Sequence, residues 1–117
     1  MSPSTAREPR ALLWDARRAA GLVEDFVRDH ALDDYRDDVL LRSAVERQFE
    51  IIGEALNRLS RQSPDLADRV PDLPRLVAFR NILIHGYAVV DDTIVWDAAT
   101  RRLPGLIRRL DGLLAEH

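Results

Sequence analysis

Residues 33–62 read DDYRDDVLLRSAVERQFEIIGEALNRLSRQ, a long amphipathic pattern. Its apolar residues recur every three or four positions, as one face of an α-helix requires. They are Leu41, Val45, Phe49, Ile52, Leu56 and Leu59. Asp33 and Asp34 precede this run and are suitable N-terminal caps. We therefore predict one helix of about 25 residues that ends near Gln62 and forms the spine of a helical bundle.

A second amphipathic helix is expected before this spine, beginning after Pro9 and running to about His30. Its apolar residues alternate at spacings of four and three, which places them on one stripe. They are Leu12, Ala16, Ala19, Val23 and Phe26, with His30 at the end. This stripe should pack against the spine.

Proline, glycine and aspartate divide the rest of the chain. Ser63-Pro64 predicts a short turn of helix, and Pro74 predicts the start of a helix that stops near Gly86. Asp91-Asp92 can cap another helix, which Pro104-Gly105 should divide from a last one. Short connections between these segments favour an antiparallel arrangement.

The fold class is therefore all-α, a bundle of four to five helices in a single domain over residues 1–117, with residues 1–9 as a flexible N-terminus. The chain contains no cysteine, which excludes disulfides and thiolate metal sites and favours a cytoplasmic location. No apolar run approaches the roughly 20 residues of a membrane span, so no membrane association is expected.

The charge balance argues against a protein that coats nucleic acid by bulk attraction, because the net charge is −3. Charge is nevertheless uneven along the chain, with a basic stretch late in the sequence. It contains Arg101, Arg102, Arg108 and Arg109. Two interpretations stay open: a solvated helix surface, or a basic rim that guides RNA.

The chemistry is concentrated in residues 80–87, Arg-Asn-Ile-Leu-Ile-His-Gly-Tyr. At 100° per residue, the four polar side chains of this segment share one broad arc. Leu76, Phe79, Ile82 and Leu83 fall on the other side, so we expect Arg80, Asn81, His85 and Tyr87 to point away from the core. Three apolar residues lie inside the polar arc, which predicts that a second subunit of a homodimer covers them. They are Val77, Ile84 and Ala88.

The spacing of Arg80, His85 and Tyr87 resembles the Rx4HxY motif of HEPN-domain toxins of the HepT type. The similarity extends from about residue 11 to residue 114. Its other landmarks are Ala44-Val45-Glu46-Arg47, Ile51-Ile52-Gly53-Glu54-Ala55, Ile94-Val95-Trp96 and Leu103-Pro104.

This resemblance implies a HEPN-like bundle that acts as a metal-independent RNA endonuclease and needs no cofactor. It further implies the toxin of a type II/VII-like toxin–antitoxin pair, whose partner is an MNT-type nucleotidyltransferase antitoxin that transfers AMP to Tyr87. Arg80 would stabilise charge on the phosphate of the RNA substrate, and His85 would transfer protons. A homodimer would supply the second His85 that the reaction requires, because His30 and His117 are poorly placed for this role.

Several of these residues also have structural interpretations. Arg80 could form an ion pair with Glu50 or Glu54, and Glu54 could pair with Arg58 or help to orient Arg80. His85 could cap its helix. Trp14 and Trp96 are expected to be core anchors rather than platforms on which bases stack.

Two roles remain open for Asn81, which either orients His85 four residues later or contacts RNA. Tyr87 could simply pack its ring. At the level of function, the alternatives to a nuclease are a non-catalytic partner that presents substrate or nucleotide to a nucleotidyltransferase, and a structural dimerisation domain.

Overall fold

A computed structural model describes residues 8–85 and 90–116, in which all regular secondary structure is helical. The elements are α1 (Pro9–Val27), α2 (Leu32–Asp37), α3 (Val39–Gln62), α4 (Pro64–Ala67), α5 (Leu73–His85), α6 (Asp92–Asp97), the π-helical segment η2 (Ala98–Arg102) and α7 (Leu103–Glu116). The predicted all-α class is confirmed. No helix within the described ranges is long and apolar enough to cross a membrane.

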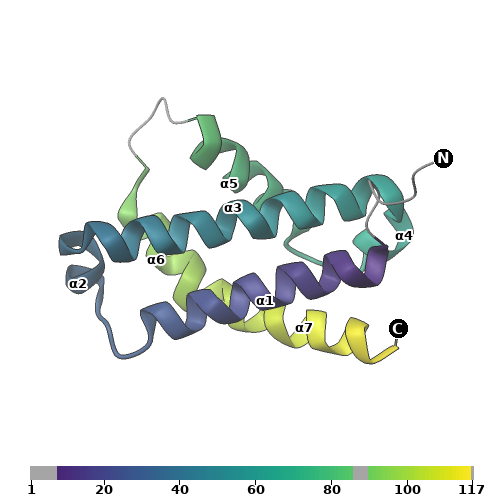
Figure 1. Cartoon of the computed structure of the whole chain (residues 1–117), viewed down its shortest axis with the longest axis horizontal. Helices are drawn as coiled ribbons and strands as arrows, with labels where there is room; N and C mark the ends of the chain where they lie inside the picture. The colour runs from purple at the N-terminus through teal and green to yellow at the C-terminus, as the bar shows by residue number, and fades with distance from the viewer. Residues whose placement is uncertain (1–7, 86–89, 117) are drawn as a thin grey trace.

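Helix α3 is the spine of the molecule, as its pattern predicted. It packs against α1 on one side and α5 on the other, and α7 packs against α1 (Figure 1). The chain runs in opposite directions along α1 and α3, which is the expected antiparallel arrangement (Figure 1). The short helices α2, α4 and α6 connect these longer elements.

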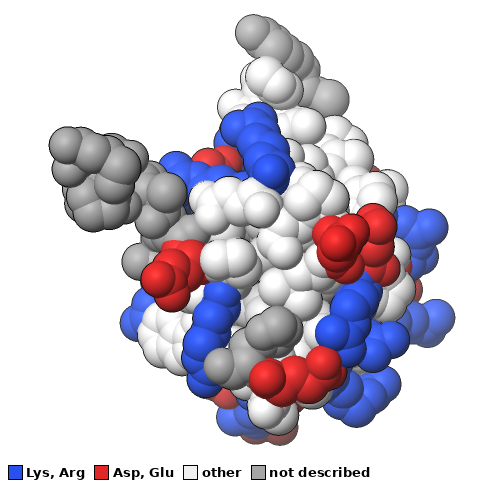
Figure 2. All heavy atoms as spheres, turned by 90° about the vertical axis from the view of Figure 1, so that its right-hand side faces the viewer, with Lys and Arg blue, Asp and Glu red and all other residues white. Residues whose placement is uncertain are grey.

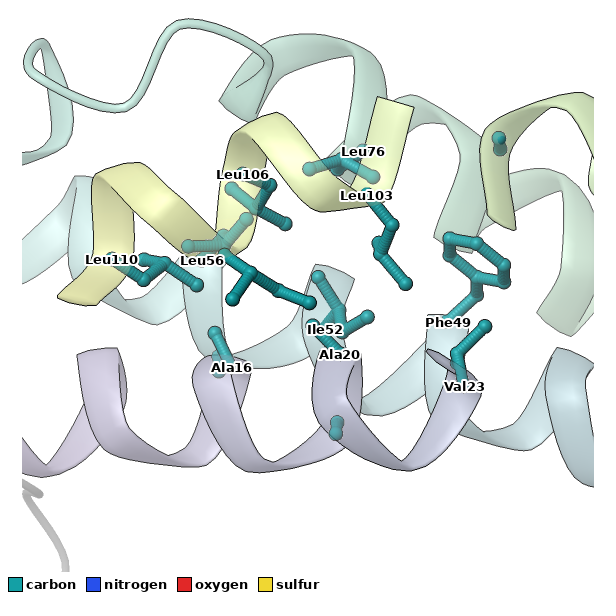
Figure 3. Close-up of a cluster of buried hydrophobic side chains, with 14 of the residues drawn as sticks. Ala16, Ala20, Val23, Phe49, Ile52, Leu56, Leu76, Leu103, Leu106 and Leu110 are labelled. Atoms are coloured by element: carbon teal, nitrogen blue, oxygen red, sulfur yellow. The ribbon is translucent and has the colours of Figure 1, made fainter. Parts of the chain in front are cut away.

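The core lies between α1, α3 and α7, whose apolar side chains point toward one another (Figure 3). Ala16 of α1, Leu56 of α3 and Leu110 of α7 are fully buried there. Leu76 brings α5 to the same core. Burying one leucine or isoleucine side chain contributes about 1.5–3 kcal/mol, so this cluster fixes how α5 sits on α3.

The spine begins later than predicted, because residues 33–62 form two helices and not one. Asp38 separates α2 from α3, and its carboxylate accepts a hydrogen bond from the Leu41 N–H at 3.0 Å. Asp34 acts inside the short α2, where it accepts from the Ala31 N–H at 2.7 Å. A run of acidic residues offers several capping positions. Helix α3 uses Asp38, which follows the predicted caps Asp33 and Asp34 in the sequence.

Helix α1 is shorter than its pattern suggested. It ends at Val27, and Asp29 adopts a φ of 65°. This left-handed conformation ends a helix, and aspartate tolerates it better than most residues. His30 is therefore an exposed residue of the turn and does not extend the apolar stripe.

Pro104-Gly105 does not divide the last two helices. The helical path continues from α6 through η2 into α7, and the Leu103 N–H bonds to the Ala98 carbonyl in the wider π geometry. A proline removes one backbone donor from a helix, and a π-helical turn beside it provides an alternative pairing. The predicted cap at Asp91 is confirmed, because its carboxylate accepts from the Thr93 N–H at 2.8 Å.

The two tryptophans occupy different environments. Trp96 is partly buried and packs against the fully buried Tyr35, with ring centroids 5.5 Å apart. Trp14 is 53% exposed, so its interpretation as a core anchor was wrong. It lies on α1 beside Arg18, on the side that the amphipathic stripe leaves in solvent.

Candidate active site

The residues of the predicted motif lie where α5 crosses α3 at very short distance. Gly53 of α3 marks this crossing. A Cβ atom placed on Gly53 would lie 2.2 Å from the Cβ of Arg80 and 3.0 Å from the Leu76 carbonyl oxygen. Only a residue without a side chain permits this approach. One turn away, Phe49 meets Phe79 edge to face, with centroids 5.2 Å apart.

The crossing places the Arg80 guanidinium against acidic and amide oxygens. Its Nη2 lies 2.6 Å from Oε2 of Glu54, and its Nη1 donates to Oδ1 of Asn81 at 2.9 Å. The other Glu54 oxygen accepts from Nε of Arg58 at 2.9 Å. Two roles of Glu54 were considered from the sequence, an ion pair with Arg58 and the orientation of Arg80. The structure shows Glu54 in both contacts. Glu50 instead pairs with Arg47.

These contacts hold the guanidinium in a fixed plane without burying it fully, since the Arg80 side chain is 23% exposed. A guanidinium carries five N–H donors in a rigid fork. Two of them serve the bonds to Glu54 and Asn81, which leaves donors for an incoming anion. The arrangement suits a phosphate group.

The helical projection placed Arg80 on the side of α5 that points away from the core, and this prediction was wrong. Arg80 belongs to the face that packs on α3, whereas Ile82, which was expected to face the core, is 55% exposed. Val77 also packs against the core, so it needs no second subunit to cover it. Apolar residues surround α5 on nearly all sides, and a helix of that composition has no single face that its pattern can identify.

Asn81 and His85 are exposed, and they lie four residues apart on α5. The Asn81 oxygen is engaged by Arg80, which adds a role that the sequence had not suggested. His85 is the last described residue of α5, and the predicted helix stop near Gly86 lies outside the described residues. Tyr87 and Ala88 lie outside the described residues.

Two grooves adjoin this site. One, of about 220 Å³, runs between α1 and α3 and is bordered by Arg18, Glu54 and Arg58. The other, of about 600 Å³ and mostly apolar, lies between α5 and the α6–η2 segment. Ile82 and Ile94 line this second groove, and both are more than half exposed.

The late basic residues do not line one groove, because Arg102 borders the groove between α5 and α6 whereas Arg108 and Arg109 border another on α7. Arg101 and Arg102 both approach the same carboxylate, that of Asp97, at 3.5 and 3.8 Å. On the end of the molecule near α4, acidic and basic side chains are interspersed (Figure 2). These observations favour the solvated-surface interpretation of the basic stretch.

The groups with shifted pKa values lie away from the Arg80 crossing. Burial raises the pKa of the Tyr35 phenol far above its ordinary value, with smaller contributions from Glu46 and Asp92. Burial is also the main cause that raises the pKa of Glu46. Glu46 precedes Glu54 by two turns of α3, about 12 Å along the helix axis. Tyr35, Glu46 and Asp92 belong to α2, α3 and α6, so this cluster lies where those three helices meet.

No set of three or more histidine, aspartate and glutamate residues in the described ranges could hold a metal ion. The groups that the structure brings together here are a cation, a carboxylate, an amide and, at the end of the same helix, an imidazole. The sequence analysis did not identify Gly53 as a residue that shapes this site by letting α5 approach α3. The available signal was a glycine in the interior of a long helix, which usually has a packing reason.

Comparison with known proteins gives a consistent result. Residues 16–113 match the family described as "Ribonuclease HepT-like". The chain is 32% identical over 110 residues to the "Probable ribonuclease HepT" of Thermococcus cleftensis, covering 92% of this chain and 96% of that protein. It is 30% identical over 107 residues to "Putative RNase MJ1380" of Methanocaldococcus jannaschii, covering 90% and 95%. No solved structure is significantly similar to the chain.

Proposed function

This chain belongs to the HepT-like ribonuclease family, and we propose that it is a metal-independent RNA endonuclease that works as a homodimer. The observation that carries this proposal is the guanidinium of Arg80, held by Glu54 and Asn81 on the helix that ends at His85. A fixed cation and a proton-transfer group on one short helix are what RNA cleavage without a metal needs.

The proposed reaction uses the 2′-hydroxyl of RNA as the nucleophile. Its oxygen attacks the adjacent phosphorus while its proton passes to one neutral His85 imidazole. The bond from phosphorus to the 5′-oxygen breaks as a protonated His85 from the second subunit gives that oxygen a proton. Arg80 stabilises the negative charge on the phosphoryl oxygens in the transition state. The products are a 2′,3′-cyclic phosphate and a free 5′-hydroxyl.

The direct test is cleavage of RNA by the purified protein in excess EDTA, with the Arg80 and His85 variants assayed beside the parent. Cleavage that disappears in EDTA and returns with Mg²⁺ would contradict the proposal. An adaptor or a dimerisation domain would leave RNA intact under every condition.

The first prediction concerns the dimer. Ile84 is 45% exposed on α5 next to His85, and Ile82 and Ile94 expose further apolar surface in the groove between α5 and α6. We expect a second copy to cover this region in an interface of about 1,200 Å² or more. Light scattering should give twice the chain mass of 13.3 kDa. Ile84→Arg should give the monomer mass and lose most of its cleavage activity, because it places a charge in the interface.

A matched control is Leu40→Arg, since Leu40 is 78% exposed at the start of α3. This variant should keep both the dimer and the activity. A parent protein that is monomeric at micromolar concentration would rule out the proposed dimer.

The second prediction concerns control by an MNT-type nucleotidyltransferase, which we propose as the antitoxin of this chain. Tyr87 follows His85 by two residues in the sequence, so a group attached to its phenol would be close to the residues of the proposed active site. AMP attached to Tyr87 would bring a phosphate toward Arg80 and a nucleoside large enough to exclude RNA. Incubation with the partner and ATP should add AMP to Tyr87 and abolish cleavage.

Tyr87→Phe keeps the ring and removes the acceptor oxygen. It should stay unmodified by intact-mass spectrometry and remain active beside the nucleotidyltransferase. AMP mass on the Phe variant would identify another acceptor. A Phe variant that is inactive before the partner is added would assign Tyr87 to the catalytic machinery and remove the basis for its control role.

A further inference from the structure

Trp14 is an unusual residue to find on the surface of this molecule. It lies in α1 and is 53% exposed. The guanidinium carbon of Arg18, one turn later, lies 5.9 Å from the centre of its ring. An exposed aromatic ring beside a cation is the arrangement on which proteins stack the bases of single-stranded nucleic acid.

Arg18 links Trp14 to a groove that reaches the candidate active site. Arg18 borders the groove between α1 and α3, and Glu54 and Arg58 border the same groove. Glu54 in turn holds Arg80 through its other oxygen. Because α3 lies between α1 and α5 (Figure 1), this surface spans two helix-to-helix spacings, roughly 20 Å in all. A strand of a few nucleotides can reach from Arg80 to Trp14.

The charges that line this groove indicate which kind of contact would contribute most to RNA affinity. Arg18, Arg47 and Arg58 line it, and so do Asp15, Glu50 and Glu54. Positive and negative side chains therefore balance, and bulk attraction for phosphate is weak. An RNA strand on this surface would gain affinity mainly from stacking, which depends little on sequence because every base has a π-face.

We propose that Trp14, supported by Arg18, is a stacking platform that binds a base of the RNA substrate some nucleotides away from the scissile phosphate. The proposal rests on the proposed ribonuclease function. It assigns Trp14 a part in positioning the substrate and none in the chemical step, so its loss should weaken RNA binding more than it slows the cleavage of bound RNA.

The experiment uses the full chain with His85→Ala, so that RNA is bound and not cut, and with Trp96→Phe, so that Trp14 is the only tryptophan. Titration with a short single-stranded RNA should quench the Trp14 fluorescence, because a stacked base contacts the indole. Loss of one stacked base corresponds to a roughly 5- to 150-fold weaker affinity, which is the change expected for Trp14→Ala when binding is followed by the anisotropy of a fluorescently labelled RNA. Trp14→Phe should recover part of the loss.

Two further measurements separate stacking from other effects. The slope of log affinity against log salt should be the same with and without Trp14, because stacking releases no counterions. In the otherwise native protein, Trp14→Ala should raise KM and leave kcat nearly unchanged. Leu40→Ala is the matched control, since Leu40 is an exposed apolar residue outside this groove and its loss should not change RNA affinity.

The outcomes are distinguishable. Quenching by RNA together with a weaker Trp14→Ala affinity supports the platform. Unchanged affinity of Trp14→Ala, in a protein whose cleavage still depends on His85, overturns the platform and leaves the ribonuclease function standing. If Trp14→Ala converted the dimer to a monomer, Trp14 would be a residue of the subunit interface, and the proposed stacking platform would again be overturned. A parent chain that binds and cuts no RNA would contradict both proposals.

Discussion

Replacing His85 with alanine should lower the rate of RNA cleavage by about 10²- to 10⁴-fold, the range that general acid–base catalysis contributes. The fold should not change, because His85 is exposed on α5. Single-turnover cleavage measures the rate, and circular dichroism checks the helix content. Histidine suits the role because it exchanges protons near neutral pH.

His30→Ala is the matched control for this substitution. His30 is also exposed, and it lies 3.8 Å from Asp34 at the far end of α1. The same chemical change at that position should leave cleavage at the parent rate. Undiminished cleavage by folded His85→Ala protein would contradict the proposed mechanism.

Two substitutions of Arg80 separate the effect of its positive charge from the effect of its planar hydrogen-bonding geometry. Arg80→Ala should reduce cleavage about as much as loss of the imidazole, since it removes the cation and leaves Glu54 without its closest partner. Arg80→Lys should remain impaired, because an ammonium group cannot bond to Glu54, Asn81 and phosphate in one plane. Recovery of the full rate in Arg80→Lys would mean that charge alone is sufficient.

The long amphipathic helices were predictable because their apolar residues repeat at the helical period over many turns. Residues 41–59 and 12–23 bury the positions that this period identifies. Pro64 and Pro74 also gave useful boundaries, because proline is tolerated in the first turn of a helix and Pro64 and Pro74 occupy the first and second positions of α4 and α5. These features depend on local sequence, so no tertiary information was needed.

The orientation of α5 was not predictable by the same argument. A helix with apolar residues on nearly every side can be packed in several ways, and the choice is made by its neighbour. Here the neighbour is Gly53, which opens a space on α3 that the Arg80 side of α5 enters. The exposure of Trp14 escaped prediction for a related reason, since residue type alone does not tell a core aromatic from a surface one.

Substituting Gly53 with alanine should therefore damage the active site more than the fold. The new Cβ would lie 2.2 Å from the Cβ of Arg80, and ordinary contact begins at 3.4 Å, so the helices must separate by about 1.2 Å. A displacement of about 1 Å in a catalytic group can cost 10²-fold in rate. We expect cleavage to fall by about that factor, with the bond between Arg80 and Glu54 lengthened or lost.

Stability should change less, because two effects oppose each other. Overpacking costs about 1–3 kcal/mol, whereas alanine is favoured over glycine inside a helix by about 1 kcal/mol. The net loss in the free energy of unfolding should be about 0–2 kcal/mol. Gly112→Ala is the matched control, because a Cβ there meets no atom within 4 Å. It should stabilise α7 by about 0.5–1 kcal/mol and leave cleavage unchanged. Urea unfolding and cleavage assays on both variants test this prediction. It is wrong if Gly53→Ala is as stable and as active as Gly112→Ala.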